Sequence, residues 1–178
     1  MHATTPRNEI GFTDLIGRHG VSKASPRINA IGVLDEASAA IGLARSMVTL
    51  ESQKELLLEA MKNLSQVMGI LAGAGGPAQL PGSPSLMDPA LSGLEAKLAE
   101  LKAVVKLPKE FNFSGRSQAS AALNLARAVV RRAEREVISL YQLEGPTDSA
   151  VVQYLNRLSK LCYLLELQND ASLEAGIG

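Results

Sequence analysis

The chain has 178 residues, a length that suits one domain able to bury a sizeable core. Lys+Arg and Asp+Glu each total 18, so the formal net charge is zero, and bulk charge favours neither nucleic acid nor an anionic membrane as a partner. One cysteine, Cys162, and two histidines exclude an intrachain disulfide and any Cys-rich or His-rich metal site.

The N-terminal residues carry no apolar segment of the kind that a secretory signal needs, and no apolar run is long enough to span a membrane. We therefore expect a soluble protein of a reducing, cytoplasmic compartment. Aromatic residues make up only 3%, Trp is absent, and Leu and Ala dominate, so the composition favours helices over a sandwich or barrel of strands.

Residues 1–26 show no sustained hydrophobic period and are predicted to form an irregular, extended N-terminal arm. Apolar residues then recur at spacings of three and four, which predicts amphipathic helices. The five predicted helices span about 27–48, 52–72, 89–105, 117–143 and 148–168. Ser25-Pro26 and Asp88-Pro89 are typical of helix starts, and Gly145-Pro146 closes the fourth helix.

These segments predict an all-α fold: a single domain over residues 1–178, with a five-helix antiparallel bundle at 27–168 and a tail at 169–178. The predicted core residues are those that carry the three-and-four spacing. In chain order they are Ala30, Leu34, Ala37, Ile41, Ala44, Val48, Leu57, Met61, Leu64, Met68, Leu71, Leu91, Leu94, Leu98, Leu101, Val105, Leu123, Ala126, Val130, Ala133, Val137, Leu140, Val151, Leu155, Leu158, Cys162 and Leu165.

The fourth predicted helix contains four arginines and a glutamate within residues 127–135. Arg127, Arg131, Glu134 and Arg135 stand at i, i+4, i+7 and i+8, so they gather on one side of the helix. Such spacing is typical of a solvated, self-paired face, and it also suits an anion site.

Several polar residues follow a core residue by one position, which places them at the edge of the buried face. There a charge is half-buried or meets a neighbouring subunit, which favours the anion-site hypothesis over a plain solvated face. These residues are Asp35, Arg127, Arg131, Glu134 and Asn156.

Motifs along most of the chain resemble the trimeric, five-helix-bundle family of ATP:cob(I)alamin adenosyltransferases, also called corrinoid adenosyltransferases. They are Val21-Ser22-Lys23, Ser25-Pro26-Arg27-Ile28, residues 30–36 with 40–44, Leu125-Ala126-Arg127 with Arg131-Arg132-Ala133-Glu134-Arg135, and Tyr154-Leu155-Asn156-Arg157-Leu158-Ser159. The Arg-Arg-Ala-Glu-Arg and Tyr-Leu-Asn-Arg-Leu-Ser motifs together are the most specific part of the resemblance.

The resemblance implies a homotrimer with active sites between subunits. ATP, its magnesium ion and a reduced corrinoid such as cobalamin would meet there, and Co(I) would attack the ribose 5′ carbon to give adenosylcobalamin and triphosphate. A corrinoid reductase and an adenosylcobalamin-dependent enzyme are the implied partners, with no role for nucleic acid or membrane.

Site residues are carried over from the family by position. The implied ATP contacts are Thr5, Gly11, Thr13, Lys23, Arg131, Arg132, Glu134, Arg135 and Asn156, with Glu134 also near magnesium. Asp35 and Arg127 are implied to pair across subunits beside the corrinoid, and Phe111 to crowd the lower face of the corrin. These three are the expected catalytic and corrinoid-binding residues.

The chain departs from the family pattern at ligand-facing positions. In the arm, Pro6 removes a basic residue and an amide donor, Asn8 replaces a glycine, and Glu9 replaces an aspartate. Asn124 stands in place of a histidine, and Lys160 in place of an aspartate. Two hypotheses therefore stand: an adenosyltransferase with an altered hold on ATP, or a relative that binds a corrinoid, nucleotide or protein without adenosyl transfer.

Overall fold

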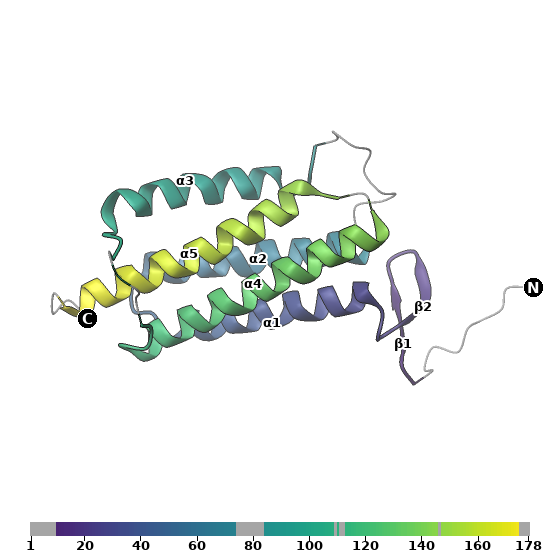
Figure 1. Ribbon diagram of the computed structural model, residues 1–178, viewed down its shortest axis with the longest axis horizontal. Helices are drawn as coiled ribbons and strands as arrows, with labels where there is room; N and C mark the ends of the chain where they lie inside the picture. The colour runs from purple at the N-terminus through teal and green to yellow at the C-terminus, as the bar shows by residue number, and fades with distance from the viewer. Residues whose placement is uncertain (1–9, 74–83, 109, 111–112, 146, 175–178) are drawn as a thin grey trace, which may run out of the picture.

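The structure is a computed structural model that describes residues 10–73, 84–108, 110, 113–145 and 147–174. Within these ranges a two-stranded sheet precedes five helices (Figure 1). The elements are β1 Phe12–Leu15, β2 Arg18–Ser22, α1 Pro26–Met47, α2 Glu51–Ala72, α3 Asp88–Val104, α4 Gln118–Glu144 and α5 Ser149–Glu174. The predicted all-α class and the five predicted helices are confirmed.

The ends of the helices follow the capping signals with one exception. The Ser25 hydroxyl accepts a hydrogen bond from the Ile28 amide at 3.4 Å, so Ser25 caps α1 as predicted. Gly145 ends α4 with a φ of 47°, a backbone conformation that favours glycine. Asp88, in contrast, is the first residue of α3, and its carboxylate accepts from the Ser85 amide at 2.8 Å in the preceding turn.

Helix α5 is longer than its sequence pattern predicts. It continues through residues 169–174, which were expected to form a tail. The reason is that the residues of these last turns that face the core are polar, so the apolar spacing stops although the helix continues. Asp170 is buried and accepts a hydrogen bond from the Ser120 hydroxyl on α4, while Asn169 donates to Ser117 at 3.0 Å.

The described part of the arm forms a β-hairpin rather than irregular chain. Strands β1 and β2 are antiparallel, with Thr13 opposite Val21, and Gly17 takes a φ of 71° in the turn. The Ile16 amide donates to the Ala72 carbonyl at 3.0 Å, which ties this turn to the end of α2. Thr5, Pro6, Asn8 and Glu9 lie outside the described residues.

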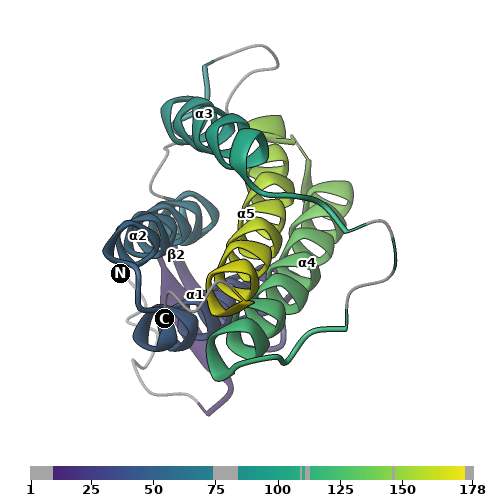
Figure 2. The same cartoon turned by 90° about the vertical axis from the view of Figure 1, so that its left-hand side faces the viewer.

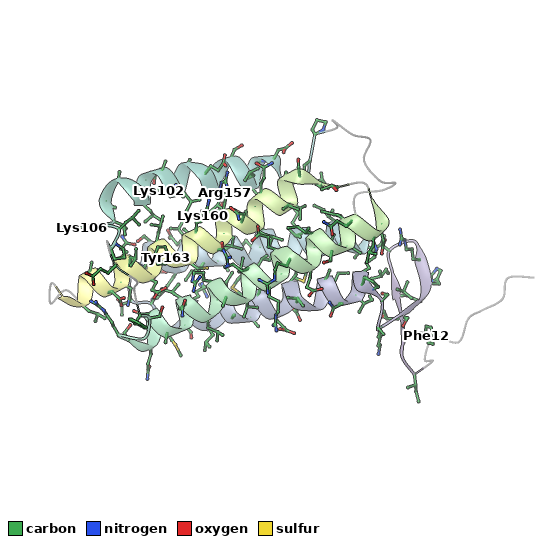
Figure 3. The ribbon with its side chains drawn as sticks, in the orientation of Figure 1. Phe12, Lys102, Lys106, Arg157, Lys160 and Tyr163 are labelled. Atoms are coloured by element: carbon green, nitrogen blue, oxygen red, sulfur yellow. The ribbon has the colours of Figure 1, made fainter. Side chains whose placement is uncertain are left out.

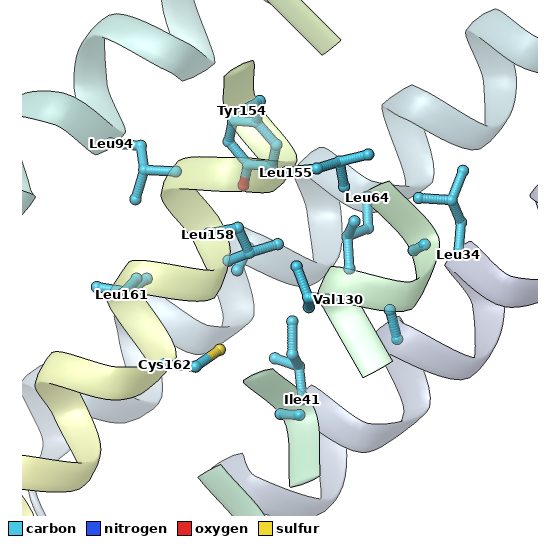
Figure 4. Packing of buried hydrophobic residues seen from close by; sticks show 14 of the residues in the cluster. Leu34, Ile41, Leu64, Leu94, Val130, Tyr154, Leu155, Leu158, Leu161 and Cys162 are labelled. Carbon is cyan, nitrogen blue, oxygen red and sulfur yellow. The ribbon is translucent and has the colours of Figure 1, made fainter. Parts of the chain in front are cut away.

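The core lies along the predicted helix faces (Figure 4). Every predicted core position in α1, α4 and α5 is buried, including Val48 just past the end of α1. In α2 the buried face is rotated slightly: Ala60 and Val67 are buried, whereas Met61 and Met68 are half-buried beside the core. The two methionines fill its edge.

Helix α5 lies between α3 and α4, as the end-on view shows (Figure 2). Helix α1 packs against α2 and α4 on the other side of the bundle. In the part of the chain that the structure describes, no helix combines the length and apolar character needed to cross a membrane. Because α5 lies between α3 and α4, these three helices form one face of the bundle. That face carries the polar residues described next.

Candidate functional site

The predicted arginine cluster lies on the outer side of α4, next to a buried face. Ala126, Val130 and Ala133 are buried, and the residues that follow them stand at the border between core and solvent. Arg127 and Glu134 are half-buried, whereas Arg131 and Arg135 are exposed. The charges thus occupy a boundary where guanidinium groups reach a ligand while their stems remain packed.

A chain of hydrogen bonds connects α4, α5 and α3 beside this cluster. Asn156 donates through Nδ2 to Glu134 Oε1 at 3.0 Å, and its Oδ1 accepts from Arg157 Nη1 at 3.1 Å. Arg157 also donates through Nε to Glu95 Oε1 at 3.0 Å. Because guanidinium only donates and carboxylate only accepts, these partners fix which side of the Asn156 amide faces each of them.

Arg132 points away from these hydrogen-bonded residues, toward α1. It forms an ion pair with Glu36, and on the same flank Asn29 donates to Glu136 at 2.8 Å. Both side chains of the Arg132–Glu36 pair are about half exposed, with 47% and 57% of their surface accessible. The structure therefore separates Arg132 from Arg131 and Glu134, although the three are close in sequence.

Arg127 is held by its own helix. Its Nε and Nη2 both donate to Asn124 Oδ1, at 3.0 and 2.7 Å. Asp35, the residue expected to pair with it, is exposed on α1 and forms no hydrogen bond or ion pair with any described residue. An Asp35–Arg127 pair is thus not formed within the described part of a single chain.

The arm residues stand at one end of the bundle. Gly11 has a φ of 90°, its carbonyl accepts from the Lys23 amide at 2.8 Å, and Thr13 is half-buried on β1. The hairpin reaches the end of α4 through Arg18 of β2, which forms an ion pair with Glu144, and Arg27 at the start of α1 pairs with the same carboxylate. Glu144 is 13 residues beyond Arg131 along α4, a rise of roughly 20 Å.

Sequence reasoning missed a buried acidic pair near Arg127. Glu166 and Asp170 on α5 are 1% and 5% exposed, and within the described residues both Glu166 oxygens and Asp170 Oδ2 have no hydrogen-bond partner. Burial raises the pKa of Glu166; the nearby Ser114 side chain opposes the rise, Asp170 adds to it, and Arg127 opposes it. A glutamate within the apolar run at 164–167 was the available signal.

The structure also bears on Cys162 and on the loop around Phe111. Cys162 is fully buried, as its place among the predicted core residues requires, and burial raises the pKa of its thiol to about 12, which makes the thiol unreactive. Phe111 lies outside the described residues, as does Asn112, while Phe113 in the same loop is 80% exposed. Among the described residues no group of three or more His, Cys, Asp or Glu side chains could hold a metal ion.

These features define a helical bundle whose outer face presents guanidinium groups beside an amide-oriented carboxylate, an arrangement suited to a phosphorylated ligand. A family model described as cobalamin adenosyltransferase matches residues 3–168. The chain belongs to the cobalamin adenosyltransferase family.

Individual relatives agree with this assignment. The chain is 34% identical over 161 residues to a cobalamin adenosyltransferase of Cupriavidus metallidurans, covering 90% of this chain and 84% of that protein. It is 31% identical over 171 residues to the corrinoid adenosyltransferase PduO of Salmonella typhimurium, covering 96% of this chain. The chain spans 50% of the length of that Salmonella protein.

Solved structures share the fold. A variant of the PduO-type ATP:corrinoid adenosyltransferase of Lactobacillus reuteri, complexed with cobalamin and ATP, superposes with a TM-score of 0.77 at 26% identity. The match covers 92% of this chain and 89% of that one. A second variant of the same enzyme, also with cobalamin and ATP, gives a TM-score of 0.78 at 27% identity, with coverage of 92% and 91%.

Proposed function

We propose that this chain transfers the 5′-deoxyadenosyl group of ATP to the Co(I) of a reduced corrinoid. The observation that carries the proposal is the α4 face itself, where Arg127, Arg131 and Arg135 border the Glu134–Asn156 hydrogen bond. The family match over residues 3–168 supplies the reaction class. We also propose that residues 1–178 act as one domain.

The reaction makes one bond and breaks one. The electron pair of Co(I) attacks the ribose 5′ carbon, the cobalt–carbon bond forms, and the carbon–oxygen bond breaks, with its electron pair leaving on triphosphate. Arg131 and Arg135 stabilise the negative charge that develops on the leaving group, through donors fixed beforehand in a partly dehydrated site. No protein acid or base is needed, so the absence of a histidine on this face agrees with the chemistry.

Glu134 is the residue that fits a magnesium ion. Its Oε1 accepts from Asn156, which leaves Oε2 for a ligand, and the described residues offer no group of three or more His, Cys, Asp or Glu side chains that could form a protein cage. Magnesium is usually held by one or two carboxylates together with substrate phosphates, so one glutamate beside a triphosphate is sufficient. The ion would neutralise phosphate charge, while Asn156 keeps the Glu134 carboxylate in position.

Two features of the single chain support a homotrimer with shared sites: the distance of the arm from the arginines, and an aspartate without a described partner. The arm residues Gly11, Thr13 and Lys23 stand near the end of α4, about 20 Å along that helix from Arg131. Asp35 has no described partner. A second copy of the chain would complete the site. It would bring its arm, with Thr5, to the arginine face, and its Asp35 would pair with Arg127 beside the corrinoid.

The remaining assignments belong to the same proposal. Arg132 reaches ATP if it exchanges Glu36 for phosphate, and Phe111 crowds the lower face of the corrin from the loop after α3. The protein works in the cytoplasm, receives its corrinoid from a reductase and delivers the product to an adenosylcobalamin-dependent enzyme.

One observation favours a second hypothesis, a relative that binds without transferring. Asn124 stands where the family pattern has a histidine, and it holds the Arg127 guanidinium through two hydrogen bonds, which competes with Asp35 for that group. Binding of a corrinoid without ATP is the outcome expected if the arm substitutions Pro6, Asn8 and Glu9 have removed the nucleotide site.

A spectroscopic assay tests the proposal. Chemically reduced cobalamin, ATP and magnesium are mixed with the protein, and formation of the cobalt–carbon bond is followed in the visible spectrum. We expect turnover, and light scattering is expected to give the mass of a trimer. Absence of turnover with every nucleotide tried would overturn catalysis. Calorimetric titrations with cobalamin and with ATP then identify what a binding-only relative retains.

A further inference from the structure

The exposed side of α5 forms a ridge between α3 and α4. Asn156, Lys160 and Tyr163 stand at i, i+4 and i+7 and therefore share this side of the helix. Asn156 reaches α4 through Glu134, and Arg157 reaches α3 through Glu95. The ridge thus continues directly from the candidate site along α5.

Two contacts fix which residues of α4 lie opposite the ridge. Glu134 bonds to Asn156, and Ser120 bonds to Asp170, so advancing fourteen residues along α5 moves fourteen back along α4. Tyr163, seven residues beyond Asn156, is therefore level with Arg127, seven residues before Glu134. By the same register Lys160 is level with Val130 and next to Arg131. The ridge lies alongside the arginines of the proposed ATP and corrinoid site.

Two lysines lie on the other side of α5, Lys102 in the last turn of α3 and Lys106 just after that helix ends. Helix α3 runs in the same direction as α5 (Figure 1), and the Glu95–Arg157 pair sets their relative level. Seven residues beyond Glu95, Lys102 is therefore level with Leu164, the residue after Tyr163, and Lys106 follows just past the end of α3. Figure 3 shows Lys102, Lys106, Lys160 and Tyr163 along α3 and α5, while Phe12 stands apart on β1.

The charge of this surface is not balanced within the described chain. Lys102, Lys106 and Lys160 are exposed, and none forms an ion pair with a described residue, whereas Lys54 and Lys97 on other surfaces pair with neighbouring glutamates. The acid of α5 closest along the helix, Glu166, is buried. Three ammonium groups on one surface without an anionic partner raise its positive potential, so an anion that docks there is favoured.

We propose that Lys102 and Lys160, with Tyr163 between them, bind the phosphodiester of the nucleotide tail of the corrinoid substrate. This rests on the proposed function. A complete corrinoid carries one phosphodiester in the tail that links its corrin to the lower base, and triphosphate already has the α4 arginines as partners. The Tyr163 hydroxyl donates a hydrogen bond, and its ring offers a surface for the base. This surface makes the protein selective for corrinoids that carry the tail.

The test compares cobalamin with cobinamide, which lacks the nucleotide tail and its phosphodiester. Both are reduced and titrated as substrates of the full chain and of the variants Lys102→Glu, Lys160→Glu and their combination. An exposed charge pair is worth a few-fold in affinity, so each single change is expected to raise KM for cobalamin about three- to fivefold, and the double change about tenfold. KM for cobinamide and kcat are expected to stay within about twofold.

Matched controls separate a local effect from a general one. Lys62→Glu makes the same change at an exposed lysine of α2 without a described partner, and it should leave both KM values unchanged. Tyr163→Phe removes only the hydroxyl and is expected to raise KM for cobalamin alone, by about twofold to fivefold. Added salt should weaken cobalamin more than cobinamide in the unmodified protein.

Equal losses for the two corrinoids, or no loss for either, would overturn the proposed tail site and assign the lysines to a solvated surface. Lack of turnover with both corrinoids counts against the proposed function instead. In that case calorimetric affinities for cobalamin and cobinamide replace KM, so the comparison of variants still decides the inference. A loss confined to cobalamin supports it in either assay.

Discussion

The Asn156 amide provides a test of the site's geometry because replacing it by an isosteric carboxylate inverts one of its two contacts. In Asn156→Asp, two carboxylates would face each other across the 3.0 Å that now separates Asn156 Nδ2 from Glu134 Oε1. At this distance two unit charges repel by about 5 kcal/mol in an effective dielectric of about 20. Both residues are half-buried, so water and side-chain relaxation reduce the effect. We expect a loss of about 1–3 kcal/mol of stability.

The sign of the pH dependence follows from the same charges. Like-charge repulsion makes the folded variant take up a proton more readily than its unfolded chain, so the penalty is present at high pH and disappears as the pair becomes protonated. Urea unfolding at fixed protein concentration measures it, with the variant compared to the unmodified protein at about pH 8 and about pH 5. Equal stability of the two proteins at the higher pH would refute the contact.

Exchanging the two groups provides the control. The double variant Glu134→Gln with Asn156→Asp retains one amide and one carboxylate, with their helices reversed, so an amide again donates across the gap. We expect its stability to return to within about 0.5 kcal/mol of the unmodified protein. Activity should not return, because the carboxylate assigned to magnesium would move from α4 to α5. Recovery of both properties would contradict the role proposed for Glu134.

Three further outcomes are expected. Arg131→Ala should lower kcat/KM about a hundredfold and change stability by less than about 0.5 kcal/mol, because the Arg131 side chain is exposed and has no described partner; a normal rate in the spectroscopic assay would remove Arg131 from the site. Gly73→Ala should destabilise the protein by about 2 kcal/mol in urea unfolding, since Gly73 has a φ of 104° and an added Cβ would lie 2.7 Å from the Ile16 carbonyl oxygen. The control Gly93→Ala, where nothing lies within 4 Å, should be neutral or stabilising, and similar losses for the two variants would show that the Ile16 contact is unimportant. Finally, the raised pKa of Glu166 means that the folded state binds the extra proton, so stability falls as pH rises from the ordinary carboxyl pKa toward the raised value. Glu166→Gln should flatten this decline in unfolding free energy between about pH 4 and about pH 8; an unchanged slope would assign the decline to other groups.

The helices could be predicted well because their signals are local. The three-and-four spacing of Leu, Ala and Val identifies a buried face in each segment, and Ser25-Pro26 and Gly145 define ends through backbone geometry that only neighbouring residues decide. The end of α5 could not be predicted in this way. Its last turns are retained by contacts such as the hydrogen bond from the Ser120 hydroxyl to Asp170, two residues that are 50 apart in the chain.

The residues of the site could be predicted from the sequence, but their hydrogen-bond and ion-pair partners could not. Periodicity indicated that Arg127, Arg131, Glu134 and Arg135 share one side of a helix, and the resemblance to adenosyltransferases indicated their ligands. Spacing alone could not show that Arg132 turns to Glu36 on α1, that Asn124 takes the Arg127 guanidinium, or that Glu95 supports Asn156 through Arg157. Each of these depends on which atom of a side chain a neighbour reaches, and several partners lie on other helices.

The sequence by itself determined the class of fold, the positions of the helices, the buried faces and the family motifs, because all of these depend on the chemistry of residues within a few turns of one another. The tertiary structure decided the hairpin's attachment to α2 and α4, the buried Glu166–Asp170 pair, and the order of α3, α5 and α4 on one face. That order sets Lys160 and Tyr163 of α5 beside the arginines of α4, with Lys102 of α3 on the other side of α5. Only the packing of helices distant in sequence fixes the register that makes a single surface of them.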